Sequence, residues 1–319
     1  MGYNNVQNVW NKQKGLFYMQ SFGIIAVWVL IGIAAVLLLV GIVDGNRFEV
    51  VRETFALPDL SKDCRFVLIS DLHNKVYGNH NDKVIAAVRE IRPDFILLAG
   101  DMVTSQVSED MTPAIELVRA LCKEYRVYYG LGNHESKMKC CRKKFGDKYE
   151  TLRKEITAAG AVLLDNESCM LPEYNMVVTG LNLDLEYFAH FKKAQMAENY
   201  LNKTIGRAQS HRCNILIAHN PDYFEEYAKW GADLVVSGHV HGGIMRLPML
   251  GGVISPSYTL FPKYDGGVFR EKDSLMLLGR GMGSHTLPFR FFNPAQLYAV
   301  ELKERAGGLA NPANGDLPG

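Results

Sequence analysis

Two histidines in a glycine-flanked loop are the first residues that could do chemistry. His239 and His241 lie in the segment 237–243, directly after an apolar run at 233–236 that is typical of a buried strand. Two imidazoles one residue apart on a tight loop can point at two neighbouring positions, and neutral imidazole is a common ligand of mid-series divalent metals. A single His-x-His pair is more often two polar loop residues. The pattern gains weight because polar residues follow four other predicted strands.

These other groups also come directly after apolar runs, and together with the two histidines they form a set of seven possible metal ligands. Carboxyl ends of neighbouring strands converge in open α/β sheets, so we expect the side chains to lie together. The set offers carboxylate, amide and imidazole groups and no thiolate: Asp71, His73, Asp101, Asn133, His219, His239 and His241. Such donors favour Mn, Fe or Zn over Ca, which prefers oxygen alone.

Seven ligands are about the number that two ions need when one carboxylate bridges them. Two metals roughly 3.5–4 Å apart clamp the attacking and leaving oxygens of a phosphoryl transfer, and a metal-bound water can have a pKa of about 7. The ligand set therefore predicts metal-dependent hydrolysis of a phosphate ester.

The elements that must position these residues alternate between strands and helices. Branched apolar runs predict strands at 65–70, 94–99, 126–129, 162–164, 176–179, 214–218 and 234–236. Helical spacing predicts helices at 81–92, 111–124, 149–159 and 221–230, and a further helical excursion over 183–201. Residues 243–302 have the Gly, Pro and aromatic content of strands with long loops. This order indicates a layered α/β domain.

Residues 15–43 contain no charged side chain. About 20 apolar residues cross a bilayer as a helix. The alternatives are a buried core helix and the apolar part of a signal peptide, which is typically shorter. We predict a short segment 1–20, a transmembrane helix 21–43, a catalytic domain 44–304 and a disordered tail 305–319.

The global charge balance points to neither nucleic acid nor an acidic partner, since 35 basic residues face 34 acidic ones. Lys and Arg are nearly tied on the two sides of the apolar stretch, and we favour a cytoplasmic N-terminus with the domain outside the membrane. Six cysteines without a Cys-x-x-Cys spacing argue mildly for the opposite facing. A basic insert at 137–148 follows His134. It is either a solvated face or a surface for an anionic lipid.

The five groups of polar residues that follow predicted strands, in this order between Arg65 and Leu302, resemble the motifs of the calcineurin-like metallophosphoesterases. The resemblance implies a four-layer α/β/β/α sandwich of two mixed sheets. It places Asp71, His73, Asp101 and His241 on one metal, and Asp101, Asn133, His219 and His239 on the other. His134 would contact the phosphate or protonate the leaving oxygen, with Asn74 and Asn133 also binding substrate. Gly100, Gly132 and Gly238 would let the backbone turn without a Cβ clash.

No Asp-Arg-Gly follows Gly100-Asp101 as it does in protein serine/threonine phosphatases, which disfavours a phosphoprotein substrate. Within the family the chain looks most like a membrane-associated bacterial branch, because of its apolar anchor, the Ser-Asp-Leu-His-Asn motif at 70–74 with Gly78 and Asn81 after it, and the Tyr-Asp-Gly-Gly run at 264–267. That branch is similar to enzymes that cleave the pyrophosphate of a UDP-acylated sugar and to cell-envelope phosphoesterases. The resemblance implies two divalent ions (Mn, Zn or Fe), a lipid-linked or other phosphorylated substrate, no nucleic-acid partner and a single-pass location in a bacterial cell membrane. The alternatives are a metal-stabilised membrane binding module without activity, which an intact His134 disfavours, and a nuclease, which the charge balance disfavours. Aromatics at 187–200 could grip an acyl chain or simply pack.

Overall fold

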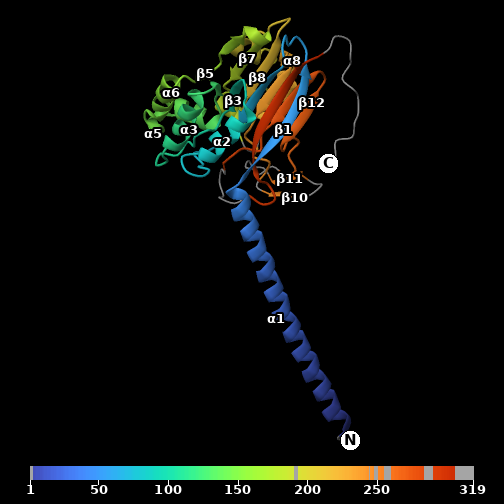
Figure 1. The fold of residues 1–319 in the computed structure, drawn as a ribbon. Coiled ribbons are helices and arrows are strands. Elements are labelled where there is room, and N and C mark those ends of the chain that lie inside the picture. Colours follow the sequence, from blue (N-terminus) through green and yellow to red (C-terminus); the bar gives the residue numbers. More distant parts are fainter. Residues whose placement is uncertain are drawn as a thin grey trace.

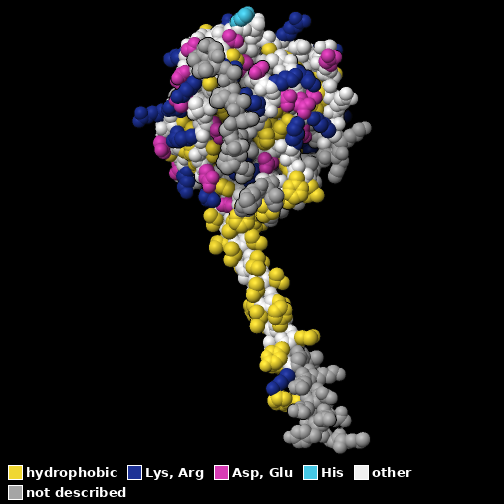
Figure 2. Space-filling view, turned by 90° about the vertical axis from the view of Figure 1, so that its right-hand side faces the viewer, with side chains coloured by type: hydrophobic (Ala, Val, Ile, Leu, Met, Phe, Trp, Pro, Cys, Tyr) yellow, Lys and Arg dark blue, Asp and Glu magenta, His cyan; other side chains and the backbone are white. Residues whose placement is uncertain are grey.

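The computed structural model describes residues 3–189, 193–243, 245–247, 251–254, 260–283 and 290–305. The chain begins with one long helix, α1 (Tyr3–Gly45), which stands away from the rest of the molecule as a stem (Figure 1). Its segment Phe17–Gly45 is long and apolar enough to cross a membrane, and none of its most apolar window is buried. Figure 2 shows hydrophobic side chains along this stem and mixed charges on the domain. The alternative of a helix buried in the core is therefore wrong.

The first sheet begins where α1 ends. Its strands, in spatial order, are β1 (Phe48–Leu57), β14 (Ala295–Glu304), β2 (Cys64–Ile69), β3 (Phe95–Ala99), β4 (Arg126–Gly130) and β5 (Val162–Leu164). β14 is antiparallel to β2, and the other neighbours are parallel. The carboxyl ends of β2, β3 and β4 consequently meet at one end of the sheet.

The second sheet packs against the first. It contains, in spatial order, β12 (Gly267–Glu271), β13 (Ser274–Leu278), β9 (Leu234–Ser237), β8 (Cys213–Ala218), β7 (Met176–Leu181) and β6 (Ser168–Leu171). The pairs β12·β13 and β6·β7 are antiparallel, so this sheet is mixed as well. A separate hairpin joins β10 (Met245–Leu247) and β11 (Gly251–Ile254).

Three apolar cores separate four layers. Leu68, Leu97, Ile217 and Leu277 are among the side chains buried between the two sheets. Outside the first sheet lie α2 (Asp82–Ile91), α3 (Thr112–Cys122), α4 (Asn133–Cys140), α5 (Arg142–Phe145) and α6 (Lys148–Ala158). Outside the second lie α7 (Tyr200–Ile205) and α8 (Phe224–Trp230). The predicted α/β/β/α sandwich of two mixed sheets, preceded by one apolar helix, is confirmed.

One helix prediction is wrong. Within the predicted excursion 183–201, the described residues hold only a 3₁₀ turn, η2 (Leu185–Phe188), and the start of α7. Leu183, Tyr187, Met196 and Leu201 do share the core over the second sheet, but their spacing of four, nine and five residues does not follow a helical period. Residues 190–192 lie outside the described part of the chain.

The basic insert is not a loop, because α4 extends to Cys140 and α5 follows at once. The predicted tail is outside the described residues except Arg305. The backbone N–H of Arg305 donates to the carbonyl oxygen of Leu57 at 3.1 Å, so the pairing of β14 with β1 continues one residue past Glu304.

Candidate metal centre

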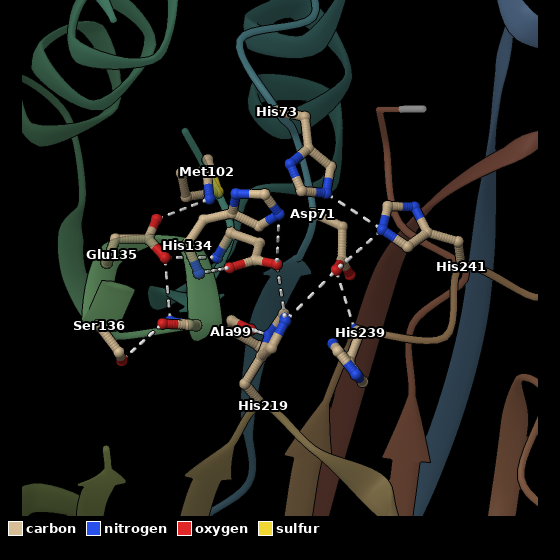
Figure 3. Close-up of polar contacts among 12 residues, drawn as sticks. Asp71, His73, Ala99, Met102, His134, Glu135, Ser136, His219, His239 and His241 are labelled. Atoms are coloured by element: carbon tan, nitrogen blue, oxygen red, sulfur yellow. Dashed lines mark hydrogen bonds and ion pairs between the residues drawn. The ribbon is translucent and has the colours of Figure 1, made fainter. Parts of the chain in front are cut away.

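The predicted ligands come together where strands of both sheets end side by side (Figure 3). They follow β2, β3 and β4 of the first sheet and β8 and β9 of the second. The loops after β2 and β3 continue the pairing of their strands, since the N–H groups of Asp71 and His73 donate to the carbonyl oxygens of Gly100 and Asp101 at 3.0 and 3.1 Å. The site is thus built on the rigid ends of paired strands.

The backbone around the site is strained. Six of the nine predicted site residues have φ between 48° and 74°, in the left-handed region: Asp71, His73, Asn74, Asp101, His239 and His241. Each such conformation costs on the order of 1–3 kcal/mol. Gly100 shares it at φ 82°, and a Cβ there would lie 2.5 Å from the backbone nitrogen of Gly132. The surrounding fold must hold these turns in place.

Two groups of donor atoms lie next to each other. Asp71, His73 and His241 form one group and Asp101, His219 and His239 the other, and the donor atoms of each lie within 4.8 Å of one another. The two Nε2 atoms of His73 and His241 are 3.1 Å apart. Nitrogen atoms that bind one ion at about 2.1 Å have about this separation.

His219 belongs to the second group but also faces Asp71 of the first. Its Nε2 is 3.1 Å from Asp101 Oδ2 and 3.6 Å from Asp71 Oδ1. Its Nδ1 is 2.7 Å from the carbonyl oxygen of Ala99, which can only accept, so Nδ1 carries a proton. The Nε2 lone pair of the neutral ring therefore faces two carboxylates, an arrangement that needs a proton or a cation between them.

The donor set fits divalent cations. Among the described residues, Asp71 Oδ2 and Asn133 Oδ1 are buried without a hydrogen-bond partner. Buried polar atoms are rarely left in this state unless a water or an ion satisfies them. The oxygen and imidazole donors are those that Mn, Zn and Fe accept.

The carboxylates create a field that attracts positive charge. Burial raises the pKa of Asp71 to about 6, with His219 opposing the rise. Burial acts in the same direction on Asp101, but the imidazoles of His219 and His134 outweigh it and hold its pKa well below the usual range. Burial alone would lower the pKa of His219, and the two carboxylates raise it to about 10. The field that keeps a proton on this imidazole would favour a metal ion in its place.

His134 is held in one tautomer. The backbone N–H of Ser105 donates to its Nδ1 at 2.7 Å, so the neutral ring carries its proton on Nε2, which is 3.9 Å from Asp101 Oδ2. Burial lowers the pKa of His134, and Asp101 only partly opposes this. The ring is therefore a neutral donor that points toward the ligand groups. Sequence reasoning missed Ser105, because a backbone N–H leaves no signal in residue type.

Glu135 was also missed. Its carboxylate is fully buried and accepts from the backbone N–H groups of Asp101, Met102 and Gly132 at 2.9, 2.9 and 3.0 Å, and from the Tyr129 hydroxyl at 2.8 Å. A longer contact of 3.4 Å reaches the N–H of Val103. Burial raises the pKa of Glu135 to about 7, yet every partner is a donor, which an ionised carboxylate accepts best. Its place at the third residue of α4, from which its carboxylate reaches back to the backbone N–H of the N-cap residue Gly132, was the available sequence signal.

The remaining predicted residues lie at the edge of the ligand groups. The N–H of Asn74 donates to the Met102 carbonyl oxygen at 3.0 Å, and both of its polar side-chain atoms are buried without a partner among the described residues. The ring of Phe188 lies 5.2 Å from that of His239, so this aromatic reaches the site. Tyr187 instead packs against Tyr200, with their ring centroids 4.9 Å apart.

Comparison with known proteins agrees with this geometry. The calcineurin-like phosphoesterase family model matches residues 64–243. The chain is similar to the uncharacterized metallophosphoesterase YkuE of Bacillus subtilis, with 26% identity over 75% of this chain and 79% of that protein. It is 25% identical to the phosphodiesterase YaeI of Escherichia coli, over 74% of this chain and 82% of that protein. A transmembrane protein with metallophosphoesterase domain from Danio rerio is 24% identical over 85% of this chain and 61% of that protein. The chain belongs to the calcineurin-like phosphoesterase family, a family of metal-dependent hydrolases.

Proposed function

We propose that this protein is a two-metal phosphoesterase that hydrolyses a phosphodiester or pyrophosphate bond. The observation that carries the proposal is the position of Asp101. Its carboxylate lies within 4.8 Å of donor atoms of His73 on one side and of His219 and His239 on the other. A carboxylate in this position is suited to bridging two ions.

Two sets of four residues, which share Asp101, would hold the two ions. Asp71, His73, Asp101 and His241 would hold one ion, and Asp101, Asn133, His219 and His239 the other. Such a pair of ions, when bound, activates water and stabilises charge on the phosphate oxygens.

His134 stabilises the leaving group. As water adds to phosphorus, the bond to the leaving oxygen breaks, and Nε2–H of the neutral His134 ring donates a hydrogen bond to this oxygen, which takes its proton from the attacking water. The side-chain amide of Asn74 is placed to donate to a phosphate oxygen. Phe188 shields the His239 side of the site from water.

Purified full-length protein tests the activity directly. After loading with Mn, the wild type should hydrolyse bis(para-nitrophenyl) phosphate, and a double variant with Asp101→Asn and His239→Ala should not. Metal content measured by mass spectrometry should fall in the same double variant. Equal turnover by the two proteins would show that the proposed centre is not the active site.

His134→Ala separates the enzyme from a metal-stabilised binding module. We expect it to keep its metal and to lose about 10²–10³-fold in kcat, the usual effect of removing one hydrogen-bond donor to developing negative charge. If the wild type and His134→Ala both keep their metal and show the same low turnover, the result would favour the binding module instead.

We further propose that the substrate is a lipid-linked phosphate, such as a UDP-acylated sugar, and that the protein is a single-pass membrane enzyme with an extracytoplasmic domain. The support is α1, whose segment Phe17–Gly45 is long and apolar enough to cross a membrane. A panel of lipid-linked pyrophosphates, UDP-acyl-sugars and simple diesters, assayed with the full-length protein in detergent, tests the substrate. Highest kcat/KM on the simple diesters would argue against it.

A further inference from the structure

The apolar helix joins the domain without a linker. The backbone N–H of Arg290 donates to the carbonyl oxygen of Gly41, in the last turns of α1, at 3.3 Å. A Cβ on Gly41 would lie 2.8 Å from the ring of Phe291, and Asp44 and Gly45 are buried against the domain. The first strand, β1, starts only three residues after α1 ends. The end of the apolar segment and the surface of the domain are therefore one rigid body.

The register of the first sheet places the metal centre at the same level as this junction. Phe48, the first residue of β1, pairs with Ala295 of β14. β14 pairs with β2 as far as Tyr298 and Leu68. Beyond this pair, residues 281–283 lie between the two strands, since the N–H of Gln296 donates to the Gly281 carbonyl oxygen at 3.2 Å and the N–H of Met282 donates to the Ser70 carbonyl oxygen at 3.0 Å. Three strand spacings then separate Phe48 from Asp71, a distance of roughly 14 Å. The ligand groups thus lie beside the point where the chain leaves α1.

A small structure, which we call the platform, contacts the end of α1 through Arg290 and Phe291. It consists of residues 245–247, 251–254, 260–261 and 290–292. Its strands β10 and β11 pair with each other. The N–H of Arg246 donates to the carbonyl oxygen of Phe291 at 3.1 Å, and the N–H of Phe261 donates to the carbonyl oxygen of Val253 at 3.0 Å. Figure 1 shows β10 and β11 next to the upper end of α1.

The platform is tied to the metal centre as closely as to the helix. Arg290 is buried, and its guanidinium donates to the carbonyl oxygens of His241 and Gly283 at 3.2 and 2.6 Å. The same residue contacts α1 through its backbone. One residue thus connects the end of the apolar helix to a candidate metal ligand, through its backbone on one side and its guanidinium on the other.

The platform exposes large apolar side chains where a soluble surface would carry charges. Leu247, Leu260, Phe261 and Phe292 are 37–64% exposed. Figure 2 shows hydrophobic side chains gathered where α1 meets the domain. Exposed apolar groups that continue a membrane-spanning helix favour the bilayer interface as their surroundings.

We propose that the platform rests in the interface of the membrane that α1 crosses, and that the metal centre takes the phosphate of a lipid headgroup from that leaflet. This inference rests on the proposed phosphoesterase activity and on α1 as a membrane span. It places the membrane contact on the platform and not on the basic segment 137–148. In Figure 1, α5 of that segment lies on the flank of the domain, away from β10, β11 and α1.

Two substrates with the same leaving group test the proposal on full-length protein in nanodiscs of phosphatidylethanolamine and phosphatidylglycerol. One is bis(para-nitrophenyl) phosphate in solution, and the other is the para-nitrophenyl ester of phosphatidic acid in the bilayer. The platform variant carries Leu260→Ser and Phe261→Ser. The matched control carries Val162→Ser and Met170→Ser, two exposed apolar side chains on β5 and β6.

We expect the platform variant to lose about tenfold or more in kcat/KM on the lipid substrate, because two apolar contacts with the interface are removed. Its kcat/KM on the soluble diester should stay within about twofold of the wild type, and the control should match the wild type on both. Equal losses on the two substrates, or no loss on the lipid, would overturn the proposal.

A second measurement does not depend on turnover. In a chain with Trp10→Phe, Trp28→Phe and Trp230→Phe, the single tryptophan of Phe261→Trp should be quenched by brominated lipids, and that of Met170→Trp should not. Equal quenching of the two variants would refute the membrane contact. If the wild type hydrolyses neither substrate, the proposed activity fails, while the quenching result still decides where the platform lies.

Discussion

The buried carboxylate of Glu135 holds the two loops that carry Asp101 and His134, and Glu135→Gln tests how much this contributes to stability. Oε2 accepts from two backbone N–H groups, those of Asp101 and Gly132. Oε1 accepts from those of Met102 and Val103 as well as from a hydroxyl. In either orientation, the amide nitrogen of glutamine would face two backbone donors that cannot turn away.

Each buried donor left without an acceptor costs about 1–3 kcal/mol, so the substitution should lower the free energy of unfolding by about 2–6 kcal/mol. At about 2–4 °C per kcal/mol for a domain of this size, the thermal midpoint should fall by roughly 4–24 °C. Near-ultraviolet circular dichroism of the full-length protein in detergent would report it. Metal should be removed with a chelator, and the pH set about one unit above the pKa of about 7 of this group.

Glu150→Gln is the matched control, since its side chain is half exposed and its one ion pair with the described residues is with Arg153 in its own helix. We expect its midpoint to stay within about 1 °C of the wild type. If Glu135→Gln unfolds at the same temperature as this control, the carboxylate does not hold the loops together and the reasoning is wrong.

Three further outcomes follow from local geometry. Gly100→Ala should destabilise the domain by about 3 kcal/mol or more beyond Gly146→Ala, in urea unfolding, because both have positive φ but only Gly100 has a backbone nitrogen 2.5 Å from the new Cβ; equal losses would contradict this. Cys140 is exposed and should react with iodoacetamide in the native protein, whereas burial raises the pKa of Cys64 to about 12 and should protect it until the protein unfolds, as peptide mass spectrometry can show. Ser105→Ala keeps the backbone N–H that donates to Nδ1 of His134 and removes only the hydroxyl, which lies 2.9 Å from the same atom, so kcat should fall less than about fivefold; a loss as large as that of His134→Ala would mean that the hydroxyl orients the ring.

The ligand loops were predictable because each follows an apolar run of the right length. The run 65–70 ends just before Asp71, and the run 94–99 ends just before Gly100 and Asp101. Parallel strands then bring these ends together. The order of the strands and the stacking of the two sheets were not available from hydrophobic patterns, and came from the family resemblance.

What the sequence did not reveal depends on contacts between distant backbones. Glu135 and Ser105 act through N–H groups 29–34 residues away, and any residue type supplies such a donor. The helix predicted over 183–201 failed for another reason. Its apolar residues do pack in one core over the second sheet, but their irregular spacing shows that they are not on one face of a helix.

The pairing of β1 with β14 also has a consequence for synthesis of the chain. β1 directly follows α1 and its partner β14 begins 247 residues after it, because Phe48 pairs with Ala295. β14 is also the strand that lies between β1 and β2. While the ribosome makes the chain, β2 to β5 can assemble early, but the position beside β1 stays open until β14 has been made. A chain cut before residue 295 would therefore keep α1 and the metal-ligand residues but lose β14, the strand that joins β1 to the rest of the first sheet.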